Sequence, residues 1–149
     1  MPESHIFTKL NMSFEDLGVV SDYLSRSSVF QHYKLGDLLG IIKQQLATKC
    51  HFAVVKDRKL IGYAGWLDTT IESGELWMAN KGLLVRAESD VADAAALTIV
   101  EVDNSAHVLP LIRRLRDDRK GKQIFFKREY ETKDRKGRKG SVLNVEMRK

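Results

Sequence analysis

Hydrophobic residues recur at helical spacing in two segments of the first third of the chain. Ser13 precedes the first segment, and the acidic residues Glu15 and Asp16 follow it, as is typical of a helix start. The apolar positions then continue to about Ser25, which predicts a helix over 13–25. A second helix is predicted over 36–48, with a buried stripe of Leu38, Leu39, Ile42 and Leu46. The intervening residues 25–33 have no period, so we expect a loop.

The pattern then changes to short runs rich in β-branched and aromatic residues. Residues 51–56 and 60–66 predict a β-hairpin around the polar turn Asp57-Arg58-Lys59. A third strand is predicted over 95–102, and residues 123–130 and 141–147 predict a terminal hairpin joined by the turn 132–140. Residues 68–90 are ambiguous, and 75–84 within them fit a helix or a strand equally well.

One further helix is expected after the 95–102 strand. Asn104 or Ser105 would cap it, and its first turns tolerate Pro110. Its apolar face consists of Val108, Leu111, Ile112 and Leu115. This order of elements predicts an α/β (α+β) fold, a mostly antiparallel sheet flanked by helices, in a single domain over 1–149.

Composition and targeting signals place the chain among globular proteins. The chain has 149 residues, of which 43% are hydrophobic and 30% charged, so wholesale disorder is not expected. No apolar run is long enough to span a bilayer, and the N-terminus lacks the pattern of a signal peptide. Cys50 is the only cysteine, which excludes an internal disulfide and suits a reducing compartment. We therefore expect a cytoplasmic protein.

Positive charge is concentrated in the C-terminal quarter of the chain. Residues 113–149 hold 15 Lys/Arg and 6 Asp/Glu, whereas residues 1–112 hold 10 basic and 14 acidic residues. The resulting asymmetry favours an acidic partner, either nucleic acid or an acidic carrier protein. We expect such binding to weaken strongly with salt.

Several stretches, taken in order, resemble known acyltransferases. The order of elements is similar to the GNAT type, but no Gln/Arg-x-x-Gly-x-Gly/Ala phosphate loop precedes the 106–118 helix. Seven stretches carry a further resemblance: 27–38 (SSVFQHYKLGDL), 52–57 (FAVVKD), 61–66 (IGYAGW), 100–102 (VEV), 111–116 (LIRRLR), 125–128 (FFKR) and 139–142 (KGSV). Through them, from about Leu17 to Val145, the chain resembles the toxin-activating lysine acyltransferases, which fatty-acylate RTX protoxins.

This resemblance implies acyl transfer from acyl carrier protein to a lysine of an RTX-like acceptor, with no other cofactor. The family uses a histidine in a Ser-Pro-x-His loop and an aspartate on a later strand. Phe30 stands at the histidine position here, with His32 two residues later. Glu101 stands at the aspartate position, with Asp103 close behind. The resemblance therefore implies His32 as the base and Glu101 as its carboxylate, whereas Asp103 is interpreted as a strand-end turn residue.

Other candidate residues have structural interpretations. Adjacent strand residues point to opposite faces, so Cys50 and His51 are not expected to form a nucleophile–base pair. No spacing resembles a zinc site, and His5 and His107 are interpreted as surface groups. Trp66 and Trp77 are expected in the core.

Two other functions remain open. The chain is interpreted alternatively as a non-catalytic binding or assembly subunit of the same fold, a homodimer being possible in either case. Nucleic-acid binding is the weakest hypothesis, because the basic segment 131–140 contains no aromatic residue for base stacking.

Overall fold

The computed structural model describes residues 5–128 and 138–143 of the chain. Its strands are β1 (Ile6–Thr8), β2 (His51–Lys56), β3 (Lys59–Thr69), β4 (Ala94–Val102), β5 (Gln123–Arg128) and β6 (Arg138–Leu143). Its helices are α1 (Phe14–Ser25), α2 (Leu35–Thr48), α3 (Ile71–Met78) and α4 (Val108–Asp118). Two 3-10 turns, η1 (Phe30–His32) and η2 (Ser105–His107), precede α2 and α4. None of the described helices is long and apolar enough to cross a membrane.

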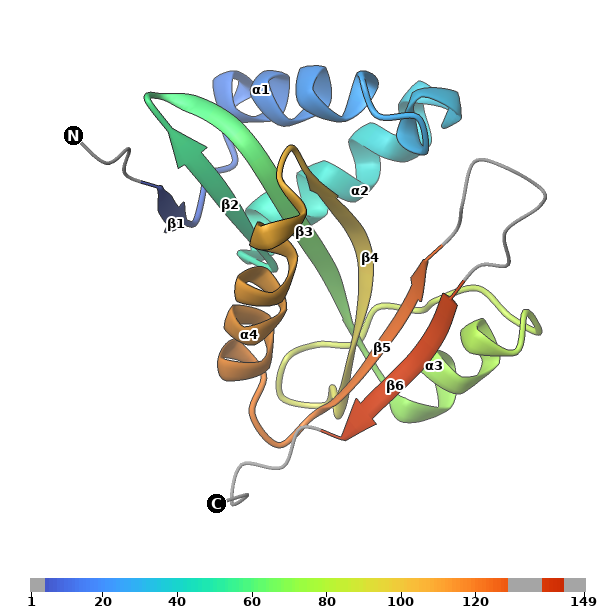
Figure 1. Ribbon diagram of the computed structural model, residues 1–149. Helices are drawn as coiled ribbons and strands as arrows, with labels where there is room; N and C mark the ends of the chain where they lie inside the picture. Colours follow the sequence, from blue (N-terminus) through green and yellow to red (C-terminus); the bar gives the residue numbers. More distant parts are fainter. Residues whose placement is uncertain (1–4, 129–137, 144–149) are drawn as a thin grey trace. The chain divides into compact units, whose positions relative to one another are not determined.

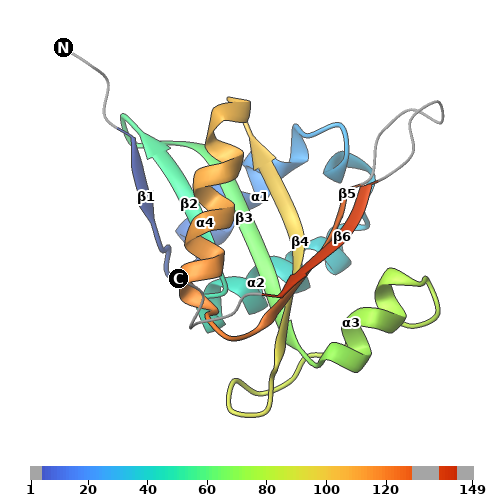
Figure 2. The same cartoon turned by 60° about the horizontal axis from the view of Figure 1, so that its bottom comes forward.

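The strands form one six-stranded sheet in the order β1-β2-β3-β4-β5-β6 (Figure 1). The pairs β1/β2, β2/β3 and β5/β6 are antiparallel, whereas β4 and β5 are parallel. The parallel pair is possible because the chain passes from β4 through η2 into α4 before it returns as β5 (Figure 2). The predicted class, a mostly antiparallel sheet flanked by helices, is confirmed.

The chain divides into two compact units, and the division falls within β3, β4 and α4. The first unit contains residues up to Gly65 together with Ile99–Arg114, and the second contains Trp66–Thr98 and the residues from Leu115 onward.

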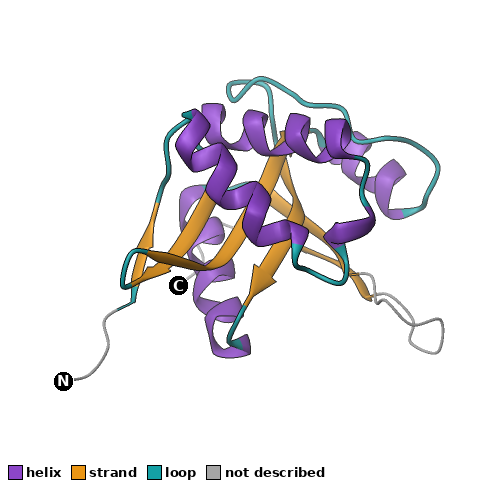
Figure 3. Cartoon of the chain, turned by 90° about the horizontal axis from the view of Figure 1, so that it is seen from above, coloured by secondary structure: helices purple, strands orange, loops and turns teal. Residues whose placement is uncertain are grey.

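The first unit holds both predicted N-terminal helices, which lie side by side (Figure 3). Ser13 caps α1 by accepting a hydrogen bond from the backbone N–H of Asp16, as predicted. The helices share one apolar core with β3 and β4. This shared burial explains the helical spacing of apolar residues that predicted α1 and α2. Its buried members are Leu17, Val20, Tyr23, Leu24, Phe30, Leu38, Ile42, Leu46, Tyr63 and Ile99.

The predicted β2–β3 hairpin is present, but its turn is tighter than the polar triplet suggested. Lys59 pairs with Lys56, so only Asp57 and Arg58 form the turn. Both have positive φ, 52° and 64°, as a two-residue type I′ turn requires. Neither residue is glycine, and this backbone conformation costs an L-residue about 1 kcal/mol. Aspartate tolerates this conformation better than arginine does, so the strain lies mainly at Arg58.

In the second unit, the ambiguous segment 68–90 contains a short helix, α3. Thr70 caps α3 through its side chain, and the helix ends before Asn80, which has a φ of 58°. Gly74 lies against Phe125, since a Cβ atom there would be 2.3 Å from the ring. Trp77, Ile71, Met78 and Leu84 pack around Ala94, Ala96 and Phe125. Both tryptophans were predicted to lie in the core. Trp66 is fully buried, whereas Trp77 is only partly buried.

The C-terminal elements agree with the predicted order. Leu111 and Leu115 are buried on α4, and Asn104 provides the predicted cap by accepting from the N–H of Ala106 at the start of η2. The terminal hairpin is present as β5 and β6, in register from Gln123 opposite Leu143 to Arg128 opposite Arg138. Residues 132–137 of the predicted turn lie outside the described residues, whereas the prediction was wrong for 138–140, which belong to β6 because they pair with β5.

A largely buried ion pair joins the turn after α4 to β3 within the second unit. The Arg119 guanidinium binds both carboxylate oxygens of Asp68, at 2.8 and 3.1 Å, and lies over the Trp66 ring at 5.3 Å. Only 18% and 10% of the two side chains are exposed. Arg119 also lies 3.6 Å from Asp118 Oδ2, but removing Asp68 would take away its more buried carboxylate partner.

We predict that Asp68→Asn lowers the free energy of unfolding by about 3 kcal/mol, measured by urea denaturation. The exposed pair Arg26–Asp22 provides a matched control, since its side chains are 70% and 74% exposed. Asp22→Asn should change stability by less than about 0.5 kcal/mol. Equal effects of the two substitutions would contradict this account.

Candidate functional site

Two carboxylates at the C-terminal end of β4 are each held by a hydroxyl group from the helical layer. Glu101 and Asp103 are two residues apart, so an extended backbone directs both side chains to the same face. Ser27 Oγ donates to Glu101 Oε1 at 3.2 Å, and Tyr23 Oη lies 3.0 Å from Asp103 Oδ1. All four residues belong to the first unit. They define the candidate site.

Ser27 fixes the direction of its own hydroxyl proton. Its oxygen accepts from the backbone N–H groups of Val29 at 3.2 Å and Phe30 at 3.4 Å. Because these amides only donate, the hydroxyl proton is free to point at Glu101. Ser27 itself is buried, with 5% exposure. A buried serine thus closes the η1 turn and holds the half-buried Glu101 carboxylate at the same time.

Tyr23 plays the corresponding part for Asp103. Its hydroxyl lies 3.0 Å from both Asp103 Oδ1 and the Ile61 carbonyl, and both are acceptors that compete for one proton. Burial, followed by the hydrogen bond and charge of Asp103, raises the pKa of Tyr23 far above its usual value. Tyr23 therefore stays a neutral donor. Asp103 follows β4 directly, as predicted for a strand-end residue, and its N–H also donates to Ile61.

The structure places the two residues of the predicted histidine loop very differently. Phe30, at the position of the family's histidine, is buried in the core, and its ring packs against Tyr33 at 5.3 Å. His32 ends the η1 turn and is exposed. Among the described residues no hydrogen bond or ion pair joins the His32 imidazole to Glu101. The loop and Glu101 are thus brought together through Ser27, and the assignment of His32 as a base stays a prediction.

A buried histidine, His51, has a structural role that the sequence did not predict. Its Nδ1 lies 3.0 Å from the Gln45 carbonyl, and its Nε2 accepts from the N–H of Leu10 at 2.7 Å. These partners require the neutral tautomer with the proton on Nδ1. Both nitrogens are therefore occupied, so His51 is not available as a base for the buried Cys50.

His51 also stacks on Tyr63, whose hydroxyl donates to Gln45 Oε1 at 2.8 Å. The same glutamine side chain fills the space beside Gly65, where a Cβ atom would lie 2.0 Å from Gln45 Oε1. Burial is the main reason that the pKa of His51 is lowered to about 4. The N-terminal arm before α1 is therefore attached to α2 and β3 through a neutral histidine.

The interpretation of His107 as a surface group is wrong. His107 is 8% exposed, and its ring lies 4.8 Å from the His5 ring and 6.0 Å from Phe7. The reason is that β1 adds to the edge of the sheet and brings His5 and Phe7 against η2. His5 is exposed, as predicted.

The described residues contain no group of three His, Cys, Asp or Glu side chains that would hold a metal ion. The connection between β4 and α4, residues 103–107, contains no glycine. A glycine-rich loop that cradles a cofactor pyrophosphate is therefore not present at this helix start.

Comparison with known proteins identifies the fold. No protein-family model matches the sequence, and no curated protein is significantly similar to it. The loading GNATL domain of CurA from Lyngbya majuscula superimposes with a TM-score of 0.59 at 10% identity, over 84% of this chain and 65% of that one. A GNAT-family acetyltransferase from Streptococcus agalactiae has a TM-score of 0.58 at 10% identity, over 86% and 78% of the two chains.

A GCN5-related N-acetyltransferase from Kribbella flavida has a TM-score of 0.53 at 13% identity, over 86% of this chain and 31% of that one. The chain thus spans less than two thirds of the CurA domain and of the Kribbella protein. At these identities the comparisons show the fold alone. The expectation of a GNAT-like fold is confirmed.

We predict that Ser27→Ala lowers the free energy of unfolding by about 2 kcal/mol, because the Glu101 carboxylate and two amides lose a partner. The neighbouring Ser28 is exposed, and Ser28→Ala should stay within about 0.5 kcal/mol of the wild type. Chemical denaturation of the two variants checks this. Equal free energies of unfolding for the two variants would show that Ser27 does not stabilise the site.

We also predict an acid-sensitive contribution from His51. Because its folded-state pKa is near 4 and the ordinary value is 6.5, the unfolded chain binds the proton more readily between these values. The contribution is complete above pH 6.5 and decreases as the pH falls towards 4, by up to about 3 kcal/mol. Unfolding free energies measured across this range should fall less steeply for His51→Gln. Parallel curves for the variant and the wild type would refute the assignment.

Proposed function

We propose that this chain is an acyltransferase that moves a fatty acyl group from acyl carrier protein to the ε-amine of a lysine on an RTX-like acceptor protein. The observation that supports this most is the hydrogen bond between Ser27 and Glu101 at 3.2 Å. It joins the loop and the strand that the resemblance pairs as the catalytic segments. The shared fold with GNAT acetyltransferases is consistent with acyl transfer.

The reaction requires little of the protein beyond positioning and proton transfer. The lysine nitrogen attacks the thioester carbonyl, the C–N bond forms, and the C–S bond breaks to release the carrier thiol. The amine must lose a proton before or during attack, and a histidine such as His32 is suited to accept it at neutral pH. Glu101, held in a fixed direction by Ser27, would bind and orient the lysine ammonium until the base removes its proton.

A carrier protein is a better donor for this chain than coenzyme A. The connection that precedes α4 lacks the glycine-rich phosphate loop, so the nucleotide of a coenzyme would find no backbone cradle there. Acyl carrier proteins are acidic, and residues 113–149 carry an excess of nine positive charges (15 basic and 6 acidic residues). Among these, Arg113 and Lys120 are exposed.

One specific observation favours a second function, that of a non-catalytic subunit of the same fold. Phe30 occupies the position that resembles the family's histidine, and it is buried with 6% exposure in the core of the first unit. Phenylalanine accepts no proton, and its burial gives it a structural role. In this alternative the Ser27–Glu101 contact would only support the fold and a binding surface.

We predict that wild-type protein, mixed with acylated carrier protein and a lysine-containing acceptor, releases free carrier and acylates the acceptor. Mass spectrometry of both proteins measures this. Glu101→Gln and His32→Ala should each lower the rate by at least about a hundredfold, a typical loss for an acid–base group. His5→Ala, another exposed histidine, should keep the wild-type rate.

Carrier that stays acylated in the presence of folded wild-type protein would favour the non-catalytic subunit. An unchanged rate in His32→Ala, with a lost rate in Glu101→Gln, would leave acyl transfer standing and assign proton transfer to Glu101 alone.

A further inference from the structure

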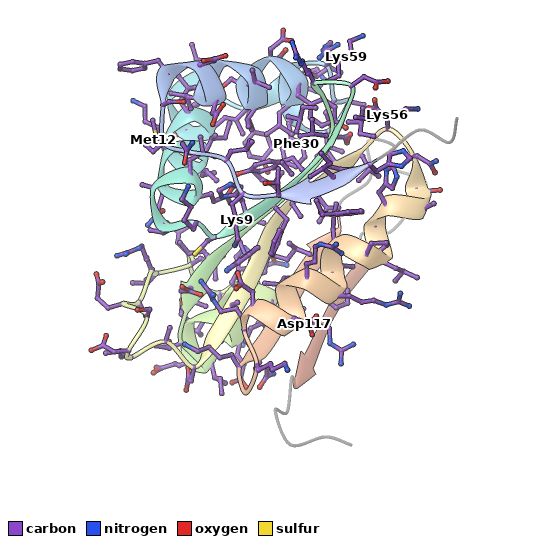
Figure 4. The ribbon with its side chains drawn as sticks, turned by 90° about the vertical axis from the view of Figure 1, so that its left-hand side faces the viewer. Lys9, Met12, Phe30, Lys56, Lys59 and Asp117 are labelled. Carbon is purple, nitrogen blue, oxygen red and sulfur yellow. The ribbon has the colours of Figure 1, made fainter. Side chains whose placement is uncertain are left out.

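The turn of the β2–β3 hairpin carries an unusual density of positive charge. Lys56, Arg58 and Lys59 surround Asp57, so three of four consecutive residues are cationic. Lys56 and Lys59 pair across the last rung of the hairpin and come from its two strands, and both lie at the same end of the hairpin (Figure 4). Arg58 and Lys59 are exposed. The described fold uses neither charge, because neither side chain forms a hydrogen bond or ion pair with a described residue.

The backbone of this turn is not what folding alone would favour. Arg58 has a φ of 64°, a conformation in which glycine or asparagine is strongly preferred over a long side chain. Such strain is retained where the side chain contributes something outside folding. Since Arg58 is exposed and has no partner in the described fold, its contribution must be sought in an intermolecular contact.

The turn also lies close to the candidate site. Lys59 precedes Ile61 by two residues, about 7 Å along a strand. The Ile61 carbonyl accepts from the Asp103 N–H at 2.9 Å and lies 3.0 Å from the Tyr23 hydroxyl. A partner seated on the hairpin turn would therefore be adjacent to the carboxylates at the end of β4. All of these residues belong to the first unit.

We propose that Lys56, Arg58 and Lys59 form a docking surface for the acidic face of the acyl carrier protein. This inference rests on the proposed function, and it specifies where the donor binds. The three cations, one on the two-residue turn and two on the strand residues that flank it, complement clustered carboxylates and steer their approach. A nucleic acid fits this surface less well, because residues 56–59 include no aromatic side chain on which a base would stack.

Two glycine substitutions at adjacent turn positions test the docking surface. Both substitutions, Arg58→Gly and Asp57→Gly, place glycine at a positive φ, so Arg58→Gly should raise the Tm by about 3 °C and Asp57→Gly should raise it by less. Only Arg58→Gly removes a cation. We expect it to weaken carrier binding about fivefold at low salt and to reduce the salt dependence of the Kd. Asp57→Gly should bind the carrier at least as tightly as the wild type.

A binding titration with purified carrier protein and the 149-residue chain distinguishes failure of the docking surface from failure of the proposed function. If the wild type binds the carrier and Arg58→Gly binds it equally well, the docking surface is refuted and the proposed function stands. If the wild type does not bind the carrier, the proposed function itself fails. If Arg58→Gly instead loses affinity for an oligonucleotide while carrier binding is unchanged, the turn is a nucleic-acid contact and the proposal is overturned.

Discussion

The end of β4 is the point on which the candidate site depends, and hydrogen bonds from two hydroxyl groups hold it in place. Ser27 holds Glu101, and Tyr23 holds Asp103 and the neighbouring strand through the Ile61 carbonyl. Each carboxylate thereby lies against a directed hydroxyl group. The helical layer and the sheet are thus linked by polar contacts at one end of the core, and the link places fixed negative charge beside the loop that follows α1.

This arrangement explains what a site of this kind would and would not supply. A fixed carboxylate orients an incoming ammonium and reduces the entropic cost of attack. It does not by itself provide an imidazole, because Phe30 is buried in the core and His32 is exposed at the end of η1. Catalysis here would therefore depend on a loop residue that the apo fold does not pre-position, or on Glu101 alone. Without a group that accepts the proton, the same scaffold would be a non-catalytic binding subunit.

Much of the fold could be predicted from the sequence, because burial imposes the helical period of α1 and α2 and the apolar runs of β2 and β4. The tight turn at Asp57 and Arg58 was not, since Arg58 is not a residue that the second position of a type I′ turn normally selects. Nor were the polar contacts of Ser27, Tyr23 and His51, because each joins residues 38 or more positions apart or depends on a backbone carbonyl. His107 was misjudged for a related reason: its burial comes from β1, whose three residues carry too little pattern to predict.

The most direct test is a double-mutant cycle on Ser27 and Glu101. Unfolding free energies would be measured at neutral pH for Ser27→Ala, Glu101→Gln and the double variant. If the two side chains interact as described, the second substitution should cost less in the presence of the first, with a coupling energy of about 1–2 kcal/mol. Additive effects, within about 0.3 kcal/mol, would show that the loop and β4 are not joined through this hydrogen bond.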